Sequence, residues 1–142
     1  MPAHVTLSPR QLSRAMLAVA IGGALGTLAR DLSLTLDPVS HSRSWIAHVP
    51  WVLLVINIVG VFVATALLRG PLRHHDPNDT WRLVWVTGVL GGFTSYSSLF
   101  VALGEIWHLS VSAGIATGAL AVASGVAAAA LGLRVRVRLP RR

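Results

Sequence analysis

Apolar residues form four long blocks along the chain, at about residues 15–34, 50–68, 83–107 and 109–133. Each block is close to the roughly 20 residues that a helix needs to cross the hydrocarbon core of a bilayer. The segments between the first three blocks carry proline, serine and charged residues, which are typical of loops. The last two blocks are almost contiguous, which predicts an antiparallel helical hairpin. The pattern predicts an all-α membrane protein with four transmembrane helices in a single membrane domain, residues 1–142, which ends in a basic tail at residues 134–142.

The first block has a second interpretation as a secretory signal peptide. Arg10 and Arg14 precede it, and the sequence TLA at residues 27–29 is similar to a cleavage site. The neighbouring Arg30 and Asp31 are more typical of the end of a helix that is retained. Both interpretations leave an integral membrane protein.

Composition narrows the class of partner. The chain is 54% hydrophobic and 12% charged, whereas a soluble domain is about a quarter charged. The absence of cysteine excludes disulfides and thiolate metal sites. All of the 12 basic residues are arginine, but aromatic residues do not alternate with them as in a nucleic-acid surface, so no nucleic-acid binding is expected. The basic tail fits anionic lipid headgroups better.

The arginines also predict an orientation in the cell inner membrane. If the four helices alternate in direction, all arginines except Arg30 and Arg43 lie on the same side as the two termini. Cytoplasmic segments of membrane proteins are enriched in basic residues, so both termini are expected in the cytoplasm.

Glycines are spaced for close helix packing in the first and last blocks. Glycines four residues apart, or seven apart on one helix face, let two backbones approach where lipid supplies no hydrophobic force. These glycines are Gly22 and Gly26, Gly114 and Gly118, and the series Gly118, Gly125 and Gly132. Packing within one chain and packing between chains both remain open.

The third block contains the sequence GGFTSYSSLF at residues 91–100, in which two glycines precede five hydroxyl residues. Single Ser or Thr residues in membrane helices often bond the carbonyl one turn earlier, but five in succession are unusual. Gly91 and Gly92 predict a break in the third helix that is surrounded by protein, because backbone groups cannot stay unpaired in hydrocarbon. Freed carbonyls at a break can hold a cation, and freed amides of the next half-helix suit an anion.

Asn57 is the only strongly polar residue of the second block. An Asn in a membrane helix can hold two helices together. Its neutral amide also carries two donors, which can bind and release a small anion that a fixed cation would trap. Both interpretations remain open.

Three motifs resemble the CrcB/Fluc family of fluoride channels, namely GGALGTLAR at 22–30, NIVG at 57–60 and GVLGGFTSYSS at 88–98. The resemblance covers all four helices in order, and the third motif is the specific one. It implies a fluoride-selective ion channel that exports cytoplasmic fluoride passively and so reduces fluoride toxicity. It also implies an antiparallel dimer with a structural sodium ion at its centre.

The resemblance assigns expected roles to individual residues. Backbone carbonyls of Gly91 and Thr94 would bind the sodium ion. The pore would be lined by Asn57, Tyr96, Ser97, Ser98, Leu99 and Thr117. Structural roles would fall to Arg30, Gly22, Gly26 and Gly60.

Several positions depart from the family pattern. Tyr96 and Leu99 replace two pore phenylalanines, and Thr117 and Ala121 stand where the fourth helix of the family usually carries Tyr and Ser. Together with the one-sided arginines, these departures favour a second hypothesis: a non-conducting or half-pore subunit that pairs with an inverted paralogue.

Two other classes of function are less favoured. A four-helix drug/proton antiporter needs a carboxylate within the membrane, and the first helix offers only Asp31, at its end. No enzymatic activity and no catalytic residue are expected, because the chain has no Gly-x-x-x-x-Gly-Lys motif and its one glutamate, Glu105, has no convincing partner.

Overall fold

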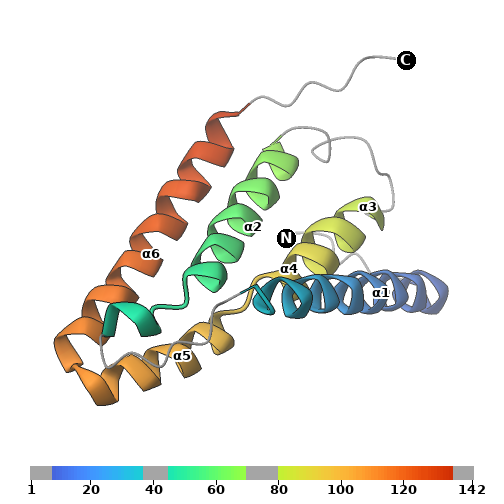
Figure 1. The fold of residues 1–142 in the computed structure, drawn as a ribbon. Coiled ribbons are helices and arrows are strands. Elements are labelled where there is room, and N and C mark those ends of the chain that lie inside the picture. The colour runs from blue at the N-terminus through green and yellow to red at the C-terminus, as the bar shows by residue number, and fades with distance from the viewer. Residues whose placement is uncertain (1–7, 37–44, 70–79, 136–142) are drawn as a thin grey trace, which may run out of the picture.

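The structure is a computed structural model that describes residues 8–36, 45–69 and 80–135. These residues form helices and no strand (Figure 1). Four stretches are long and apolar enough to cross a membrane: Pro9–Leu34, Trp51–Arg69, Thr80–Leu109 and Val111–Arg134. The predicted fold class, an all-α membrane protein with four spans, is confirmed.

The first span is α1 (Pro9–Leu34), which begins before residue 15 because Ser8 caps it. The Ser8 hydroxyl accepts a hydrogen bond from the Gln11 amide, and the Gln11 side chain accepts one from the Ser8 amide. This reciprocal pair satisfies two amides at the start of a helix. A short 3-10 helix, η1 (Trp45–His48), precedes the second span, α2 (Trp51–Arg69).

The third span is divided into four pieces. It starts as α3 (Thr80–Arg82), continues as a π-helical stretch, η2 (Leu83–Leu90), and ends its first half as α4 (Gly91–Phe93). Two extended residues, Thr94 and Ser95, separate this half from α5 (Tyr96–Leu109). The expected break near Gly91–Thr94 is confirmed. Both glycines are helical, however, and the interruption follows them.

The last span, α6 (Val111–Arg134), starts at its capping residue Ser110, directly after α5. The Ser110 hydroxyl accepts a hydrogen bond from the Ala113 amide. With one residue between them, α5 and α6 form the predicted hairpin, and Trp107 of α5 lies against Gly114 of α6.

Glycines bring α1 and the first half of the third span into backbone contact. A Cβ atom at Gly22 would lie 2.5 Å from the Val84 carbonyl oxygen, and one at Gly26 would collide with the Val89 carbonyl. From the other side, Gly88 faces Gly22, and Gly92 faces Gly23. Residue numbers rise together along both helices, so the two helices run parallel. The Gly22–Gly26 step therefore serves packing within one chain.

The second pair of parallel helices is α2 and α6, which lie side by side in Figure 1. A core where their starts meet α5 and η1 contains Val49, Leu53, Leu54, Leu99, Ile106 and Ala113. Near their ends, Gly132 faces Thr65 and the Phe62 carbonyl. Gly132 is thus also used within the chain.

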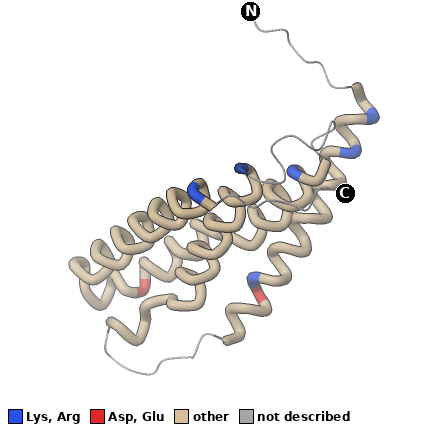
Figure 2. The backbone as a smooth tube through the Cα atoms, turned by 90° about the horizontal axis from the view of Figure 1, so that it is seen from above, with Lys and Arg blue, Asp and Glu red and all other residues tan. Residues whose placement is uncertain are grey.

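Helix direction and charge agree with four alternating spans. Figure 2 shows the described Arg positions, in blue, along one side of the molecule, except for one that lies beside an acidic residue. The arginines of the first group are Arg10, Arg14, Arg69, Arg82 and Arg134. The exception is Arg30, which pairs with Asp31 at 3.1 Å.

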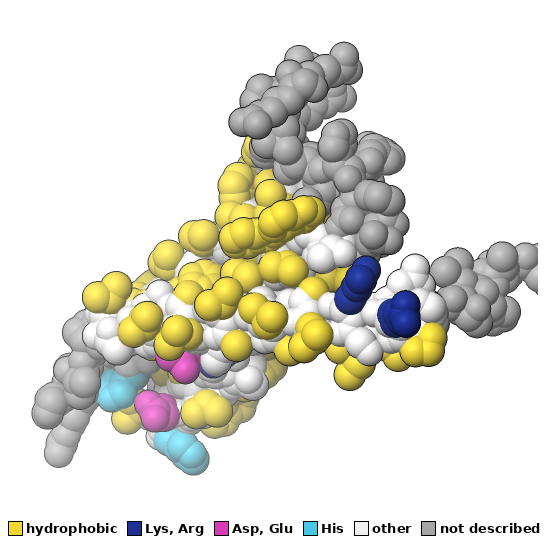
Figure 3. Space-filling model, turned by 90° about the vertical axis from the view of Figure 1, so that its right-hand side faces the viewer, with side chains coloured by type: hydrophobic (Ala, Val, Ile, Leu, Met, Phe, Trp, Pro, Cys, Tyr) yellow, Lys and Arg dark blue, Asp and Glu magenta, His cyan; other side chains and the backbone are white. Residues whose placement is uncertain are grey.

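The outer surface is strongly apolar. Figure 3 shows hydrophobic side chains over much of one face of the molecule. Exposed apolar side chains follow α1 along its length, at Leu12, Met16, Leu17, Ile21, Leu25, Leu28 and Leu32. Such a surface fits lipid or a second chain.

Candidate functional site

Two hydroxyl residues cap the halves of the broken third span. Thr94 closes the first half, because both its amide and its hydroxyl donate to the Leu90 carbonyl, each at 2.9 Å. Ser95 opens the second half, because its hydroxyl accepts a hydrogen bond from the Ser98 amide at 3.2 Å. The local bonding of hydroxyls to backbone that is common in membrane helices therefore accounts for the start of the hydroxyl run.

The next residues extend this cap into a small hydroxyl cluster. The Ser95 hydroxyl lies 3.1 Å from the Ser97 hydroxyl and 2.9 Å from the Ser98 hydroxyl. Ser95 is buried at 8% exposure, and Ser98 is half-buried, whereas Tyr96 and Ser97 are exposed. The cluster therefore presents one open edge, at Ser97.

Asn57 reaches this cluster from α2. Its Oδ1 atom accepts a hydrogen bond from the Ser95 amide at 3.0 Å, and its Nδ2 atom donates a long one to the Ser95 carbonyl at 3.5 Å. Of the two interpretations that the sequence left open, a link between two helices is the one that these contacts describe. Asn57 and the hydroxyls of Ser97 and Ser98 thus all contact Ser95, and their pore roles stay predictions.

The Gly91 and Thr94 carbonyls are among the backbone carbonyls that lose their helical donors at the break. In a continuous α-helix, the Gly91 carbonyl would accept from the Ser95 amide, and the Thr94 carbonyl from the Ser98 amide. The Ser95 amide donates to Asn57 instead, and the Ser98 amide to the Ser95 hydroxyl. These are the two carbonyls that were expected to bind sodium. Carbonyl oxygens that can replace an ion's hydration shell are suited to an alkali cation. These two oxygens are therefore suitable ligands for a sodium ion.

The other expected pore residues lie in different surroundings. Leu99 is 4% exposed and belongs to the core with Leu53 and Ile106. Thr117 on α6 is also 4% exposed. Tyr96 is 56% exposed, and its hydroxyl lies 3.8 Å from the place of a Cβ atom at Gly125. The pore roles of these residues stay predictions.

Of the expected structural residues, Gly22, Gly26 and Gly60 contact the third span, whereas Arg30 contacts its neighbour on α1. Gly60 on α2 faces Thr94, and a Cβ atom there would collide with the Thr94 methyl group. Arg30, near the end of α1, donates from Nε and Nη2 to the Asp31 carboxylate at 3.2 and 3.1 Å.

Ser95 was absent from the residues expected to build the site. It is nevertheless the one that contacts Asn57 and caps α5. Its position just before a helix start is where a serine cap is common. That preference could have identified Ser95, had the start of α5 been placed at Tyr96.

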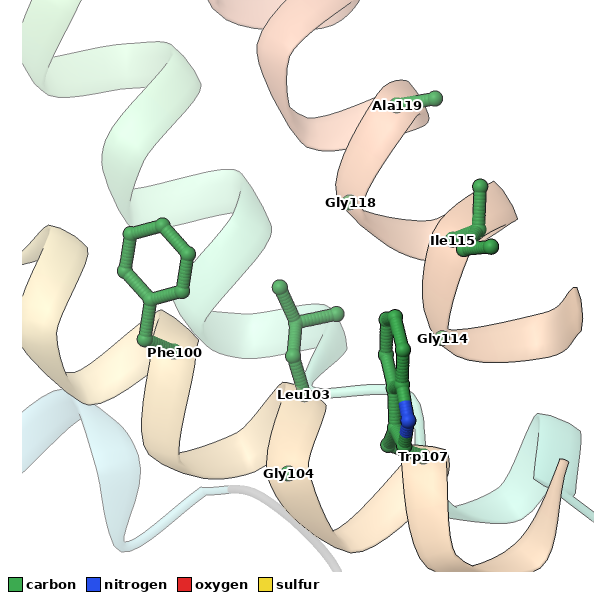
Figure 4. A pocket seen from close by; sticks show the side chains of 8 residues that line it. All are labelled: Phe100, Leu103, Gly104, Trp107, Gly114, Ile115, Gly118 and Ala119. Atoms are coloured by element: carbon green, nitrogen blue, oxygen red, sulfur yellow. The ribbon is translucent and has the colours of Figure 1, made fainter. Parts of the chain in front are cut away.

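A groove between α5 and α6 has a volume of about 490 Å³. Figure 4 shows Phe100, Leu103 and Trp107 projecting from α5 toward α6, where Gly114 and Gly118 leave space. Its lining is almost wholly apolar, so it offers no site for a bare ion. The hydroxyl cluster at the break is therefore the candidate ion site.

Comparison with known proteins identifies the family of this chain. Residues 17–133 match the family described as "CrcB-like protein, Camphor Resistance (CrcB)". The "Fluoride-specific ion channel FluC 2" of Leifsonia xyli subsp. xyli (strain CTCB07) is 41% identical over 128 residues, which are 84% of this chain and 81% of that protein. The "Fluoride-specific ion channel FluC 1" of Cutibacterium acnes (strain DSM 16379 / KPA171202) is 38% identical over 115 residues, 72% and 76% of the two chains. The "Fluoride-specific ion channel FluC" of Chelativorans sp. (strain BNC1) is 29% identical over 119 residues, 83% and 92% of the two chains. Because the family match runs through all four membrane-crossing helices, the chain belongs to the CrcB family.

Proposed function

We propose that the chain is a fluoride-selective ion channel that lets cytoplasmic fluoride leave the cell passively and so reduces fluoride toxicity. Fluoride is small and strongly hydrated, so a pathway must replace its water with hydrogen-bond donors that also release it. The amide of Asn57 and the hydroxyl of Ser97 are neutral donors at a break within a membrane span. This arrangement, in a member of a family whose relatives are named as fluoride channels, carries the proposal.

An antiparallel dimer completes the pathway in this proposal. Tyr96 and Ser97 are exposed on the surface of the single chain, where they would otherwise meet lipid. A second copy laid against this face would enclose them. Lipid would then contact only the apolar remainder of the surface.

A structural sodium ion at the dimer centre would be held by the carbonyls of Gly91 and Thr94. One chain supplies two oxygens, which are too few to replace the hydration shell of a cation. Two chains related by a two-fold axis supply four. The ion would link the two breaks and would not itself be transported.

A second candidate is a subunit that pairs with an inverted paralogue rather than with a copy of itself. A homodimer of opposed chains requires insertion in both directions, but the described arginines other than Arg30 lie on one side. The asymmetry supports the proposal that both termini lie in the cytoplasm and that the four helices cross the inner membrane. Leu99 is buried in the core and offers no aromatic ring to a pore, so the partner would supply the missing groups.

Fluoride efflux from liposomes tests the function. Vesicles loaded with potassium fluoride and containing the purified chain should release fluoride to an electrode when a potassium ionophore balances the charge, while chloride stays inside. Replacement of Ser97 by Ala should slow release, because an exposed hydroxyl of the cluster is lost. The matched control is Ser112→Ala, which removes an exposed hydroxyl outside the cluster.

The three results separate the candidates. Efflux with the chain alone supports the channel as a homodimer. Efflux only when an inverted paralogue is co-reconstituted supports the paired subunit. Vesicles that retain fluoride in both preparations would contradict the proposed function.

A further inference from the structure

One side chain, Asn57, bonds both backbone groups of a single residue across the helix break. A helical residue directs its N–H and C=O groups in opposite directions along the helix axis. An extended residue directs both to the same side, as in the hydrogen-bonded pairs of an antiparallel sheet. Ser95 is extended, with φ −146° and ψ 108°. A carboxamide carries an acceptor and a donor side by side, so Asn57 can occupy the place of a neighbouring β-strand.

The extended conformation of Ser95 depends on this partner. Ser95 is buried, and its amide donates to Asn57 rather than to the Gly91 carbonyl. Its carbonyl accepts the long bond from Asn57 and a bond of 3.4 Å from the Leu99 amide. Unpaired backbone groups are strongly disfavoured in hydrocarbon. Without Asn57, the Ser95 amide would lose its partner, and nothing on α2 would hold Ser95 extended.

Gly60 supplies a second contact between α2 and the break. Residues three apart share one face of a helix, so Asn57 and Gly60 both face the third span. Asn57 bonds Ser95, and the missing side chain of Gly60 leaves room for the Thr94 methyl group. Ser95 thus contacts Asn57, and Thr94 contacts Gly60. These two contacts explain the Asn-x-x-Gly spacing of residues 57–60.

We propose that Asn57 is a positioning residue, which holds Ser95 extended and so sets where α5 begins and which edge of the hydroxyl cluster stays open. It acts through the Ser95 backbone. Gly60 assists by letting α2 approach Thr94.

The same contact determines the orientation of the Asn57 amide. If the carboxamide were turned over, its NH₂ group would face the Ser95 N–H, and its oxygen would face the Ser95 carbonyl. One Nδ2 hydrogen is therefore committed to Ser95. In the described part of the chain the other meets no acceptor. One point rests on the proposed function: this second hydrogen is the one that would bind fluoride.

Asn57→Asp tests the positioning role through pH. An ionised carboxylate only accepts hydrogen bonds, so it would repel the Ser95 carbonyl, whereas a protonated carboxyl both accepts and donates, as the amide does. The melting temperature of this variant in detergent should be lower than that of the wild type at pH 8, and the deficit should shrink at pH 5. The melting temperature of the wild type at the same two pH values corrects for the titration of other groups. Residues 83–104 and α2 before Arg69 carry no Asp, Glu, Arg or His, and on α1 the Arg30–Asp31 pair is unchanged.

Hydrogen exchange tests the same inference without a charge. Asn57→Ala should raise backbone exchange in the peptide covering residues 94–99 by about tenfold or more, since a buried backbone bond is lost. Thr65→Val is the matched control, because Thr65 lies on the same helix and bonds only that helix's Val61 and Phe62 carbonyls. It should leave exchange in residues 94–99 unchanged.

Two results would overturn the inference. One is unchanged exchange at residues 94–99 in Asn57→Ala, even if fluoride efflux is lost, because Asn57 would then act on the ion alone. The other is an equal deficit of Asn57→Asp at both pH values. A wild-type chain that releases no fluoride would remove the proposed function and leave both stability tests unaffected.

Discussion

At the scale of single residues, the two adjacent glycines of the third span, Gly91 and Gly92, have different structural roles. Gly91 is helical, with φ −65° and ψ −36°, and a Cβ atom there would meet nothing closer than the Val86 carbonyl at 3.8 Å. A Cβ atom at Gly92 would collide with the Gly23 carbonyl of α1. The pair therefore does not interrupt the helix by backbone freedom. Gly92 lets two helices touch, whereas Gly91 is exposed and a Cβ atom there would meet no other helix.

This difference predicts unequal effects of alanine at the two positions. Gly92→Ala should destabilise the chain by about 1–3 kcal/mol, because the backbones of α1 and α4 must separate. Gly91→Ala should leave stability unchanged or raise it by up to about 1 kcal/mol, since alanine favours helix. Thermal unfolding of the two purified variants in detergent measures the difference. Equal losses in both variants would contradict the packing seen here.

At the scale of elements, apolar length alone was enough to predict four spans, because the bilayer sets the length that each helix needs. The exact place of the break was not predictable in this way. It depends on Asn57, which lies 38 positions from Ser95 in the chain and meets it only when α2 packs on the third span. The spacing of Gly22 and Gly26 predicted a close contact, but the residues that they meet, Gly88 and Val89, were identified only by the structure.

The proposed sodium ion at the break would make stability depend on sodium. The carbonyls of Gly91 and Thr94 lose their helical donors, and oxygen dipoles brought together across a dimer repel one another without a cation. Chain purified in N-methylglucamine instead of sodium, at equal ionic strength, should therefore melt at a lower temperature. Sodium at 100 times its dissociation constant would contribute about 2.7 kcal/mol. Gly91→Ala is the control, because it keeps the carbonyl and should keep the sodium effect. Identical melting temperatures of the wild-type chain in the two salts would argue against the ion.

At the scale of the whole molecule, the parallel pairs α1 with η2 and α2 with α6 imply spans of alternating direction, with the basic helix ends on one side. Such an arrangement is favourable in one orientation in the membrane and unfavourable in the other. The same fold with arginines on both sides would insert either way. Charge placement, rather than helix packing, therefore decides whether the chain can pair with an inverted copy of itself.

Cysteine labelling measures this directly, because the natural chain has no cysteine. Single cysteines replace Val135, at the basic end of α6, and Ser112, at its opposite end; both positions are exposed. A membrane-impermeant maleimide should label Ser112→Cys in intact cells and leave Val135→Cys unlabelled until the cells are opened. Equal labelling of both positions in intact cells would show insertion in two directions and favour a homodimer of opposed copies. One-sided labelling would require a partner of inverted charge to complete the pore.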